Sequence, residues 1–417
     1  MKTNLYLWIL CILFLIPESG STYPYDGYAI TGIHRLYRLE LIMAGALTGK
    51  LPSPGMLKPL KSVKLNLTGE AGASLNTIPT PDPDLQKAIN SLFPNMDESY
   101  SIAILDITPG KKVRYARRQE ARGFMPGSVA KLAVMAGLFT ELKKIYPDSF
   151  EKRQELLKKR MVRGGKWAVH DSHTVPFFDP KTHNTFKRTI QESDTFNLYE
   201  WADHMISASN NGAASVVWKE ALLMRAFGKS YPPTPQQEAD FFKNTPKARM
   251  SEIAVAVVNE PLLAVGITKE EFRLGSFFTS GAKSIISGSG GSSGSPIGLL
   301  KYLVAMEQGK FVDEPSSLEM KRLMFTSDRR IRYAGSKALA DAAVYFKSGS
   351  LYKCKQEEGY TCGKYMGNVD NYMNSVAIIE HDDGTIYIVA LMSNVLKKNS
   401  ANDHYALASQ IDRIIRK

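Results

Sequence analysis

The sequence predicts an α/β protein of the α+β type, in which an antiparallel five-stranded sheet flanked by helices lies beside an all-helical lobe. Patterns typical of strands occur near both ends of the chain, at residues 100–107, 112–116, 344–352, 375–380 and 385–393. The region between them, to about residue 332, is largely helical and is broken by a loop at 163–194. Because a long helical region separates the two groups of strands, we expect distant segments to complete one sheet.

The elements of this domain follow from local signals. Residues 85–92 have the apolar spacing of a first helix. The first two strands are joined around Pro109-Gly110, and the last two form a hairpin around Asp382-Asp383-Gly384. Residues 401–416 predict a closing helix.

Two segments precede this domain. Residues 1–21 have a basic start, an apolar run from Leu5 to Ile16 and small residues after Pro17. This pattern is typical of a secretory signal peptide, and the run is short for a membrane span. We therefore expect export to the periplasm or the extracellular space; an uncleaved anchor is the alternative.

Residues 22–83 form a separate N-terminal segment. Residues 30–50 predict a helix, and residues 51–83 are rich in Pro, Gly and Thr, which indicates a linker or an extended strap. The compact domain is expected to cover residues 84–417.

Composition narrows the classes of partner. The chain has 417 residues, 44% of them hydrophobic, so it can bury a full core. Its formal net charge of +12 implies attraction to anionic surfaces, such as cell-wall polymers. The basic residues are scattered and not interleaved with aromatic residues, so nucleic-acid binding is not expected.

Three cysteines are present, and Cys11 lies within the expected signal peptide. Cys354 and Cys362 lie in a polar loop with seven residues between them. In an exported protein this pair predicts a disulfide, and two free thiols are the alternative.

Ser128 and Lys131 are the most informative pair in the chain. They are three residues apart at the start of an apolar helix, after Pro126-Gly127. This spacing places both side chains on one helical face. A lysine that is half-buried loses solvation, so that its neutral amine can take a proton from the serine hydroxyl. Alone, the pair also fits a serine N-cap followed by an exposed lysine.

Two further motifs follow in order. Residues 209–211 read Ser-Asn-Asn, and residues 347–349 read Lys-Ser-Gly. With Ser128 and Lys131, they resemble the S-x-x-K, S-D-N and K-T-G set of the penicillin-recognising serine hydrolases, most closely class A β-lactamases. Asn210 stands in place of the middle Asp, and Ser348 in place of the Thr. The resemblance covers roughly residues 84–417 and implies the fold described above.

The resemblance assigns catalytic roles to five residues. It implies that Ser128 is the acylated nucleophile and Lys131 its base or proton relay. Ser209 would pass the proton to the leaving amine, and Asn211 would hold Lys131 and the side-chain amide of the substrate. Lys347 would present positive charge to the substrate carboxylate and assist Ser209.

Binding roles are implied for the following residues. Ser348 would hydrogen-bond the substrate carboxylate, and Gly349 would leave room for substrate along the strand. The backbone N–H groups of Ser128 and Ser350 would form an oxyanion hole. The set implies no cofactor and no metal.

One expected residue has no clear counterpart. Class A β-lactamases activate the hydrolytic water with a loop glutamate in a Glu-Pro-x-Leu-Asn context. Glu260-Pro261 is the Glu-Pro in the expected interval, but the asparagine is lacking, and residues 276–287, where the glutamate should fall, contain no carboxylate. Glu260 is therefore a weak candidate for the deacylating base, and the acyl-enzyme is expected to persist.

Two competing motifs are weaker. Residues 290–294 fit the G-x-S-x-G pattern of α/β-hydrolases but lack a preceding strand. His170 and His173, beside Asp171, have a spacing compatible with a metal but lack further ligands, which favours a solvated loop.

The sequence thus indicates a serine hydrolase that acts on β-lactams or peptidoglycan stem peptides. A D,D-carboxypeptidase or penicillin-binding protein with slow deacylation is the first alternative. A catalytically silent cell-wall binding module is the second.

Overall fold

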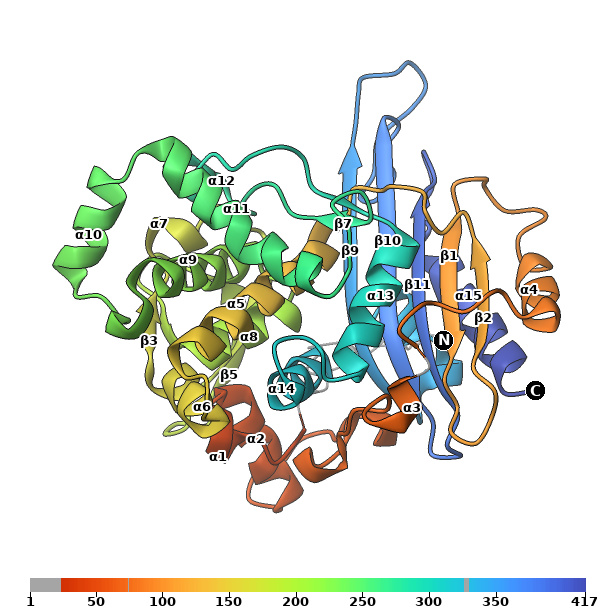
Figure 1. The fold of residues 1–417 in the computed structure, drawn as a ribbon, viewed down its shortest axis with the longest axis horizontal. Coiled ribbons are helices and arrows are strands. Elements are labelled where there is room, and N and C mark those ends of the chain that lie inside the picture. Colours follow the sequence, from red (N-terminus) through yellow and green to blue (C-terminus); the bar gives the residue numbers. More distant parts are fainter. Residues whose placement is uncertain (1–23, 74, 326–329) are drawn as a thin grey trace, which may run out of the picture.

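The computed structural model describes residues 24–417, apart from residue 74 and residues 326–329. At its centre is an antiparallel five-stranded sheet with the order β2–β1–β11–β10–β9 (Figure 1). The strands are β1 (Ser101–Asp106), β2 (Arg114–Arg118), β9 (Ala343–Lys353), β10 (Asp370–Glu380) and β11 (Ile386–Asn394). The predicted sheet, completed by both ends of the domain, is confirmed, and β9 is one of its two edge strands.

Both faces of the sheet are buried, and alternate residues of each strand enter two different cores. On β1, Ile102 and Ile104 pack into one core, whereas Ala103 and Leu105 pack into the other. Successive side chains of a strand point to opposite faces, so a strand covered on both sides has a continuous apolar sequence. This explains why these strands could be recognised as apolar runs.

Helices from the two ends of the domain cover one face. They are α4 (Pro83–Asn90) and α15 (Ala401–Ile415). Helix α4 begins where Asp82 accepts a hydrogen bond from Leu85 N, and Pro83 occupies its first turn. The opposite face is covered by α13 (Pro296–Glu307) and α14 (Glu314–Phe325) (Figure 1).

The helical lobe is built around α5 (Lys131–Ile145), which is buried on almost every side. Helices α9 (Asn211–Phe227) and α11 (Lys247–Ala264) pack directly against it. The surrounding helices are α6 (Phe150–Lys159), α8 (Leu198–Ile206), α9 (Asn211–Phe227), α10 (Pro235–Asn244), α11 (Lys247–Ala264) and α12 (Ser280–Ile285).

The expectation of a plain loop at 163–194 was wrong. This segment contains the short helix α7 (Gly165–Ala168) and a hairpin of β4 (Thr174–Phe178) with β5 (Thr185–Thr189). Its ends pair as β3 (Met161–Arg163) and β6 (Thr195–Asn197). The hairpin is largely exposed on β5, so the apolar alternation that would indicate a strand is weak.

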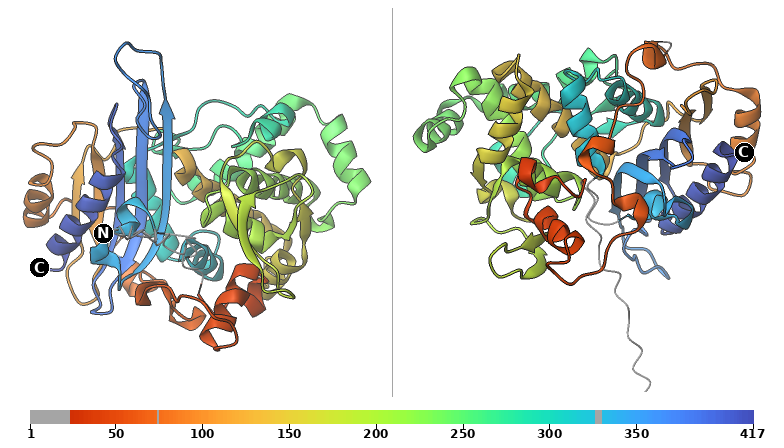
Figure 2. Two further views of the ribbon diagram at one scale, coloured as in Figure 1. Left: turned by 180° about the vertical axis from the view of Figure 1, so that it is seen from behind. Right: turned by 90° about the horizontal axis from the view of Figure 1, so that it is seen from below.

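The N-terminal segment lies across the domain as a strap of residues 24–83. It runs from the helical lobe to the sheet (Figure 2). The predicted helix at 30–50 is present as α1 (Tyr28–Thr31) and α2 (His34–Met43), and it ends at Met43. The rest of the strap contains two 3₁₀ turns, Pro54–Met56 and Leu60–Ser62, and α3 (Glu70–Ala73).

Buried contacts fix this strap. The Arg35 guanidinium donates to both carboxylate oxygens of Asp203 on α8, at 2.7 and 2.5 Å, and both side chains are buried. Further along, Lys321 Nζ donates to the carbonyl of Lys64 at 2.6 Å. Leu36 and Leu60 enter the main core.

Two predictions concern the outer parts of the chain. Cys354 and Cys362 form a disulfide between the ends of β9 and β10, as predicted. The expected signal peptide at 1–21 lies outside the described residues. Within the described ranges, none of the helices combines the length and apolarity that a membrane span requires.

Candidate active site

Ser128 lies in a tight turn that leads into α5. Residues Gly127–Ala130 form a 3₁₀ turn, and α5 begins at Lys131. Gly127 has a φ of 55°, a left-handed conformation that suits glycine. This turn holds the Ser128 hydroxyl one helical turn from the Lys131 side chain.

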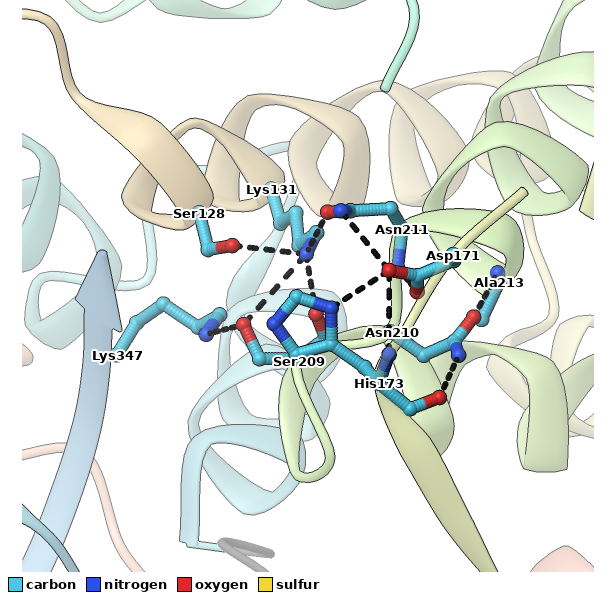
Figure 3. Close-up of polar contacts among 9 residues, drawn as sticks. All are labelled: Ser128, Lys131, Asp171, His173, Ser209, Asn210, Asn211, Ala213 and Lys347. Atoms are coloured by element: carbon cyan, nitrogen blue, oxygen red, sulfur yellow. Dashed lines mark hydrogen bonds and ion pairs between the residues drawn. The ribbon is translucent and has the colours of Figure 1, made fainter. Parts of the chain in front are cut away.

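The Lys131 amine is at the centre of the site (Figure 3). Its Nζ atom lies 2.9 Å from Ser128 Oγ and 2.8 Å from Asn211 Oδ1. It also donates to the carbonyl of Ser209 at 2.5 Å, and it lies 3.5 Å from Ser209 Oγ. When the amine is neutral, the Ser128 hydroxyl can donate its proton along the same short path.

The surroundings of Lys131 favour its neutral form. The residue is 0% exposed, and the ring of Phe278 lies 5.2 Å from Nζ. Burial lowers the pKa of Lys131 to about 7, and the charge of the nearby Asp171 carboxylate opposes this shift. A substantial fraction of the amine is therefore unprotonated near neutral pH and can act as a base.

The loop before α9 carries Ser209 and Asn211. Asn210 caps α9 by accepting from Ala213 N at 2.7 Å, as expected of a residue in the motif position that Asp occupies in the family. Ser209 has a φ of 57°, an uncommon conformation for a non-glycine residue. The cap and this backbone geometry together turn the Ser209 hydroxyl toward the two lysines (Figure 3).

Lys347 reaches the same point from the edge strand β9. Its Nζ atom donates to Ser209 Oγ at 2.8 Å and to its neighbour's carbonyl, Ser348 O, at 3.0 Å. Burial lowers the pKa of Lys347 well below its usual range, and the charges of Lys131 and Arg332 lower it further. The structure thus brings Ser128, Lys131, Ser209, Asn211 and Lys347 together in one network.

Residues after Lys347 line the same pocket. Ser348, Gly349 and Ser350 lie along its wall. Arg332 donates to the carbonyl of Gly349 and to Ser350 Oγ, both at 2.9 Å. The main chain of Ser350 lies beside Gly127, the residue before the nucleophile, which brings the two expected oxyanion-hole segments together.

The structure explains why residue 349 is a glycine, and the cause differs from the expected one. A Cβ at this position would lie 2.3 Å from the carbonyl oxygen of Pro126 and 2.8 Å from the nitrogen of Ser128. Glycine is therefore required by the close approach of β9 to the nucleophile turn, whatever space a substrate needs along the strand.

Gly349→Ala is expected to displace the nucleophile turn. Backbone atoms cannot move aside as a flexible side chain can, so we expect a stability loss of about 1–3 kcal/mol and slower reaction at Ser128. Urea denaturation and labelling of Ser128 measure the two effects. Gly291→Ala is the matched control, because no atom lies within 4 Å of a Cβ there. Equal denaturation midpoints for the two variants would contradict the close-approach argument.

Glu260 does not reach this pocket. It lies near the end of α11, its side chain is 53% exposed, and it accepts from Arg225 at 2.7 Å. The segment where the family's glutamate was expected contributes Ser276, Phe277 and Phe278 to the wall instead. The geometry therefore does not support Glu260 as a deacylating base.

The pocket is a cavity of about 770 Å³ between the sheet edge and the helical lobe. Five of its lining residues are lysine or arginine: Lys187, Lys283, Arg332, Lys347 and Lys364. No carboxylate lines the cavity in the part of the chain that the structure describes. Its electrostatic character therefore favours an anionic ligand.

Neither competing motif forms a second centre. Gly290–Gly294 lacks the strand-to-helix elbow; its Ser293–Gly294 pairs as β8 with β7 (Phe272–Arg273), and Ser292 Oγ accepts from Gly275 N at 3.1 Å. In the described ranges, no three His, Cys, Asp or Glu side chains converge as a metal site would require.

Four residues of this centre were not predicted from the sequence: Asp171, His173, Phe278 and Arg332. Arg332 contacts the network from the start of a 3₁₀ turn, Arg332–Gly335, and Phe278 from a loop; neither lies in a recognisable motif. Asp171 accepts from Asn211 N at 2.6 Å and from Asn211 Nδ2 at 3.2 Å. The sequence signal in this segment is the spacing of His170 and His173 beside Asp171, which favours a solvated loop.

Solved structures share this architecture. A class A β-lactamase representative from Bacteroides cellulosilyticus DSM 14838 matches 81% of this chain and 98% of its own, at a TM-score of 0.51 and 16% identity. A β-lactamase from Chitinophaga pinensis DSM 2588 matches 79% of this chain and 97% of its own, at a TM-score of 0.51 and 14% identity. The fold is therefore that of the β-lactamase-like proteins.

A family model gives the assignment directly. The model described as the beta-lactamase enzyme family matches residues 84–417. The chain belongs to the β-lactamase enzyme family, and the resemblance inferred from its motifs is confirmed. A search of curated proteins found no match to this chain.

Proposed function

We propose that this protein is an exported serine hydrolase that forms an acyl-enzyme through Ser128 on β-lactams or D-alanyl peptides. The observation that carries the proposal is the meeting of Ser128 Oγ with the buried Lys131 amine at 2.9 Å. A serine N-cap with an exposed lysine, the ordinary alternative, would not bury the amine or surround it with Ser209 and Asn211.

The network supports a complete acylation step. Lys131 takes the hydroxyl proton as Ser128 Oγ forms a bond to the carbonyl carbon of the substrate. The C–N bond of the lactam or peptide then breaks. Ser209, which lies between the amines of Lys131 and Lys347, passes a proton to the leaving nitrogen.

The charge of the cavity supports a substrate with a carboxylate. Lys347 and Ser348 are the residues that the family motif assigns to this group, and both line the cavity. β-Lactams and peptides that end in D-alanine both carry such a carboxylate. The cations of the wall add long-range attraction, which salt should weaken.

The two enzyme alternatives differ in how fast they release the acyl group: a β-lactamase releases it rapidly, and a D,D-carboxypeptidase or penicillin-binding protein slowly. Glu260 lies elsewhere, and no described residue of the cavity wall is a carboxylate. These observations favour a D,D-carboxypeptidase or penicillin-binding activity over rapid antibiotic hydrolysis by the glutamate-dependent route.

Intact-mass measurement after mixing with benzylpenicillin tests the proposal. We expect one adduct per wild-type molecule and none on the Ser128→Ala variant. If the protein returns to its starting mass within seconds, it is a β-lactamase. If the adduct persists for hours, it is a penicillin-binding protein. A folded wild-type protein that takes no adduct from either benzylpenicillin or a D-alanyl thioester would contradict the proposal and leave the silent binding module.

Export is the remaining part of the proposal. It is supported by the signal-peptide pattern at 1–21, which would be removed on secretion. N-terminal sequencing of protein recovered from the periplasm or medium tests it, and a chain that retains residue 1 in the cytoplasm would contradict it.

A further inference from the structure

His173 lines the same cavity as Ser128 and is built into the active-site network. Its Nδ1 atom lies 2.6 Å from Asp171 Oδ1, and its side chain is 42% exposed. A ring that donates from Nδ1 to a carboxylate presents its other nitrogen, Nε2, as an acceptor. Figure 3 shows Nε2 on the side of the ring that faces Ser209 and Lys347.

Asp171 holds this ring and also contacts the catalytic network. Its side chain is only 3% exposed and accepts from both the main-chain nitrogen and the side-chain amide of Asn211. Burial alone would raise the pKa of Asp171, but the hydrogen bonds from His173 and Asn211 outweigh it, so the pKa is lowered. An ionised carboxylate therefore lies directly behind the imidazole.

The residue that departs from the family's S-D-N motif, Asn210, also contacts the segment that carries Asp171 and His173. Asn210, which replaces the usual Asp, donates from Nδ2 to the main-chain carbonyl of His173 at 2.9 Å. An aspartate could not make this bond, because an ionised carboxylate has no donor. The substitution thus serves to hold the segment that carries His173.

No carboxylate in the described part of the cavity wall could serve as a base for hydrolysis. The other ionisable residues there are the five lysine and arginine residues and two tyrosines, Tyr352 and Tyr365. An imidazole held by a carboxylate is the recurring solution for a general base beside a serine nucleophile.

We propose that His173, oriented by Asp171, is the general base that hydrolyses the acyl-enzyme, in place of the glutamate that this chain lacks. This inference rests on the acyl-enzyme of the proposed function. A water oxygen bonds to the acyl carbon as its proton passes to His173 Nε2. The ester bond to Ser128 Oγ breaks, and the proton returns from His173 to Ser128 Oγ, which releases the acyl group as a carboxylic acid. Asp171 is a positioning residue in this step.

The test separates acylation from deacylation in His173→Ala. With benzylpenicillin or a D-alanyl thioester, we expect the rate of adduct formation to change less than threefold and the rate of adduct loss to fall by roughly 10²–10⁴-fold. Added imidazole should restore adduct loss, because it can occupy the space left by the ring. Asp171→Asn should slow adduct loss as well, without rescue by imidazole.

His170→Asn is the matched control. His170 is an exposed residue on the same loop with a φ of 65°, a conformation that asparagine tolerates, and it does not line the cavity. Unchanged adduct loss in His173→Ala, or a loss of rate that imidazole does not restore, would overturn the inference while the proposed function stands. A wild-type protein that never forms the adduct would overturn both this inference and the proposed function.

Discussion

Lys131→Met is expected to lower the rate of Ser128 acylation by roughly 10³–10⁴-fold, in the upper part of the range that general base catalysis contributes. Methionine fills the same buried channel without an amine, so the proton of the Ser128 hydroxyl loses its acceptor. The contacts at 2.9 Å to Ser128 and 2.8 Å to Asn211 are lost together. Time-resolved intact-mass measurement with benzylpenicillin gives the rate.

A matched variant shows whether the effect belongs to the amine. Lys143→Met lies on the same helix, at a partly exposed position paired with Asp313, and should acylate at the wild-type rate. If Lys131→Met retained rapid acylation while its thermal stability matched that of Lys143→Met, a different group would have to accept the proton.

The same residue predicts a pH dependence. Burial lowers the pKa of Lys131 to about 7, and the charge of the Asp171 carboxylate opposes this shift. The neutral amine is the base, so acylation should be constant above about pH 8 and should fall about tenfold per pH unit below about pH 6. A rate that rises as the pH falls would contradict the assignment of the base.

The parts of this site that the sequence could predict are those fixed by local geometry or by the family motif. Ser128 and Lys131 are one helical turn apart, so their contact requires only that α5 begins at Lys131. The strands were recognisable because both faces of the sheet are buried. Ser209 and Lys347 came from the ordered motifs, since nothing local links positions 138 residues apart.

The remaining parts depend on tertiary contacts. Asp171 contacts Asn211 across 40 positions, from a segment whose strand β5 is largely exposed. No local pattern distinguishes such a carboxylate from a solvated one. Gly349 was recognised, but its purpose depends on the approach of β9 to the nucleophile turn, which appears only in three dimensions.

The sequence predicted a helix in the first part of the strap and showed its second part only as Pro-rich and Gly-rich; the structure gives the strap an energetic role. Arg35→Ala is expected to lower the free energy of unfolding by about 3–5 kcal/mol. The substitution leaves Asp203, which is 0% exposed, without the two hydrogen bonds at 2.7 and 2.5 Å that compensate its charge. Urea denaturation followed by tryptophan fluorescence measures the loss.

Two further variants identify the cause. Arg35→Leu combined with Asp203→Leu removes both charges and should recover most of the stability, because an apolar pair needs no compensation. Arg249→Ala, which breaks the exposed pair with Glu252, should cost about 0–1 kcal/mol. If Arg35→Ala cost no more than Arg249→Ala, apolar packing of Leu36 and Leu60 would be what holds the strap.

The strap and the active site are linked through α8. Asp203 lies on this helix, and α8 ends at Ile206, directly before the loop that carries Ser209. Because Arg35 holds Asp203, loss of the pair should loosen that loop as well as the strap. We therefore expect Arg35→Ala to acylate more slowly than the double variant that combines Arg35→Leu with Asp203→Leu, at equal folded fraction. Equal acylation rates would show that the strap stabilises the domain without affecting the active site.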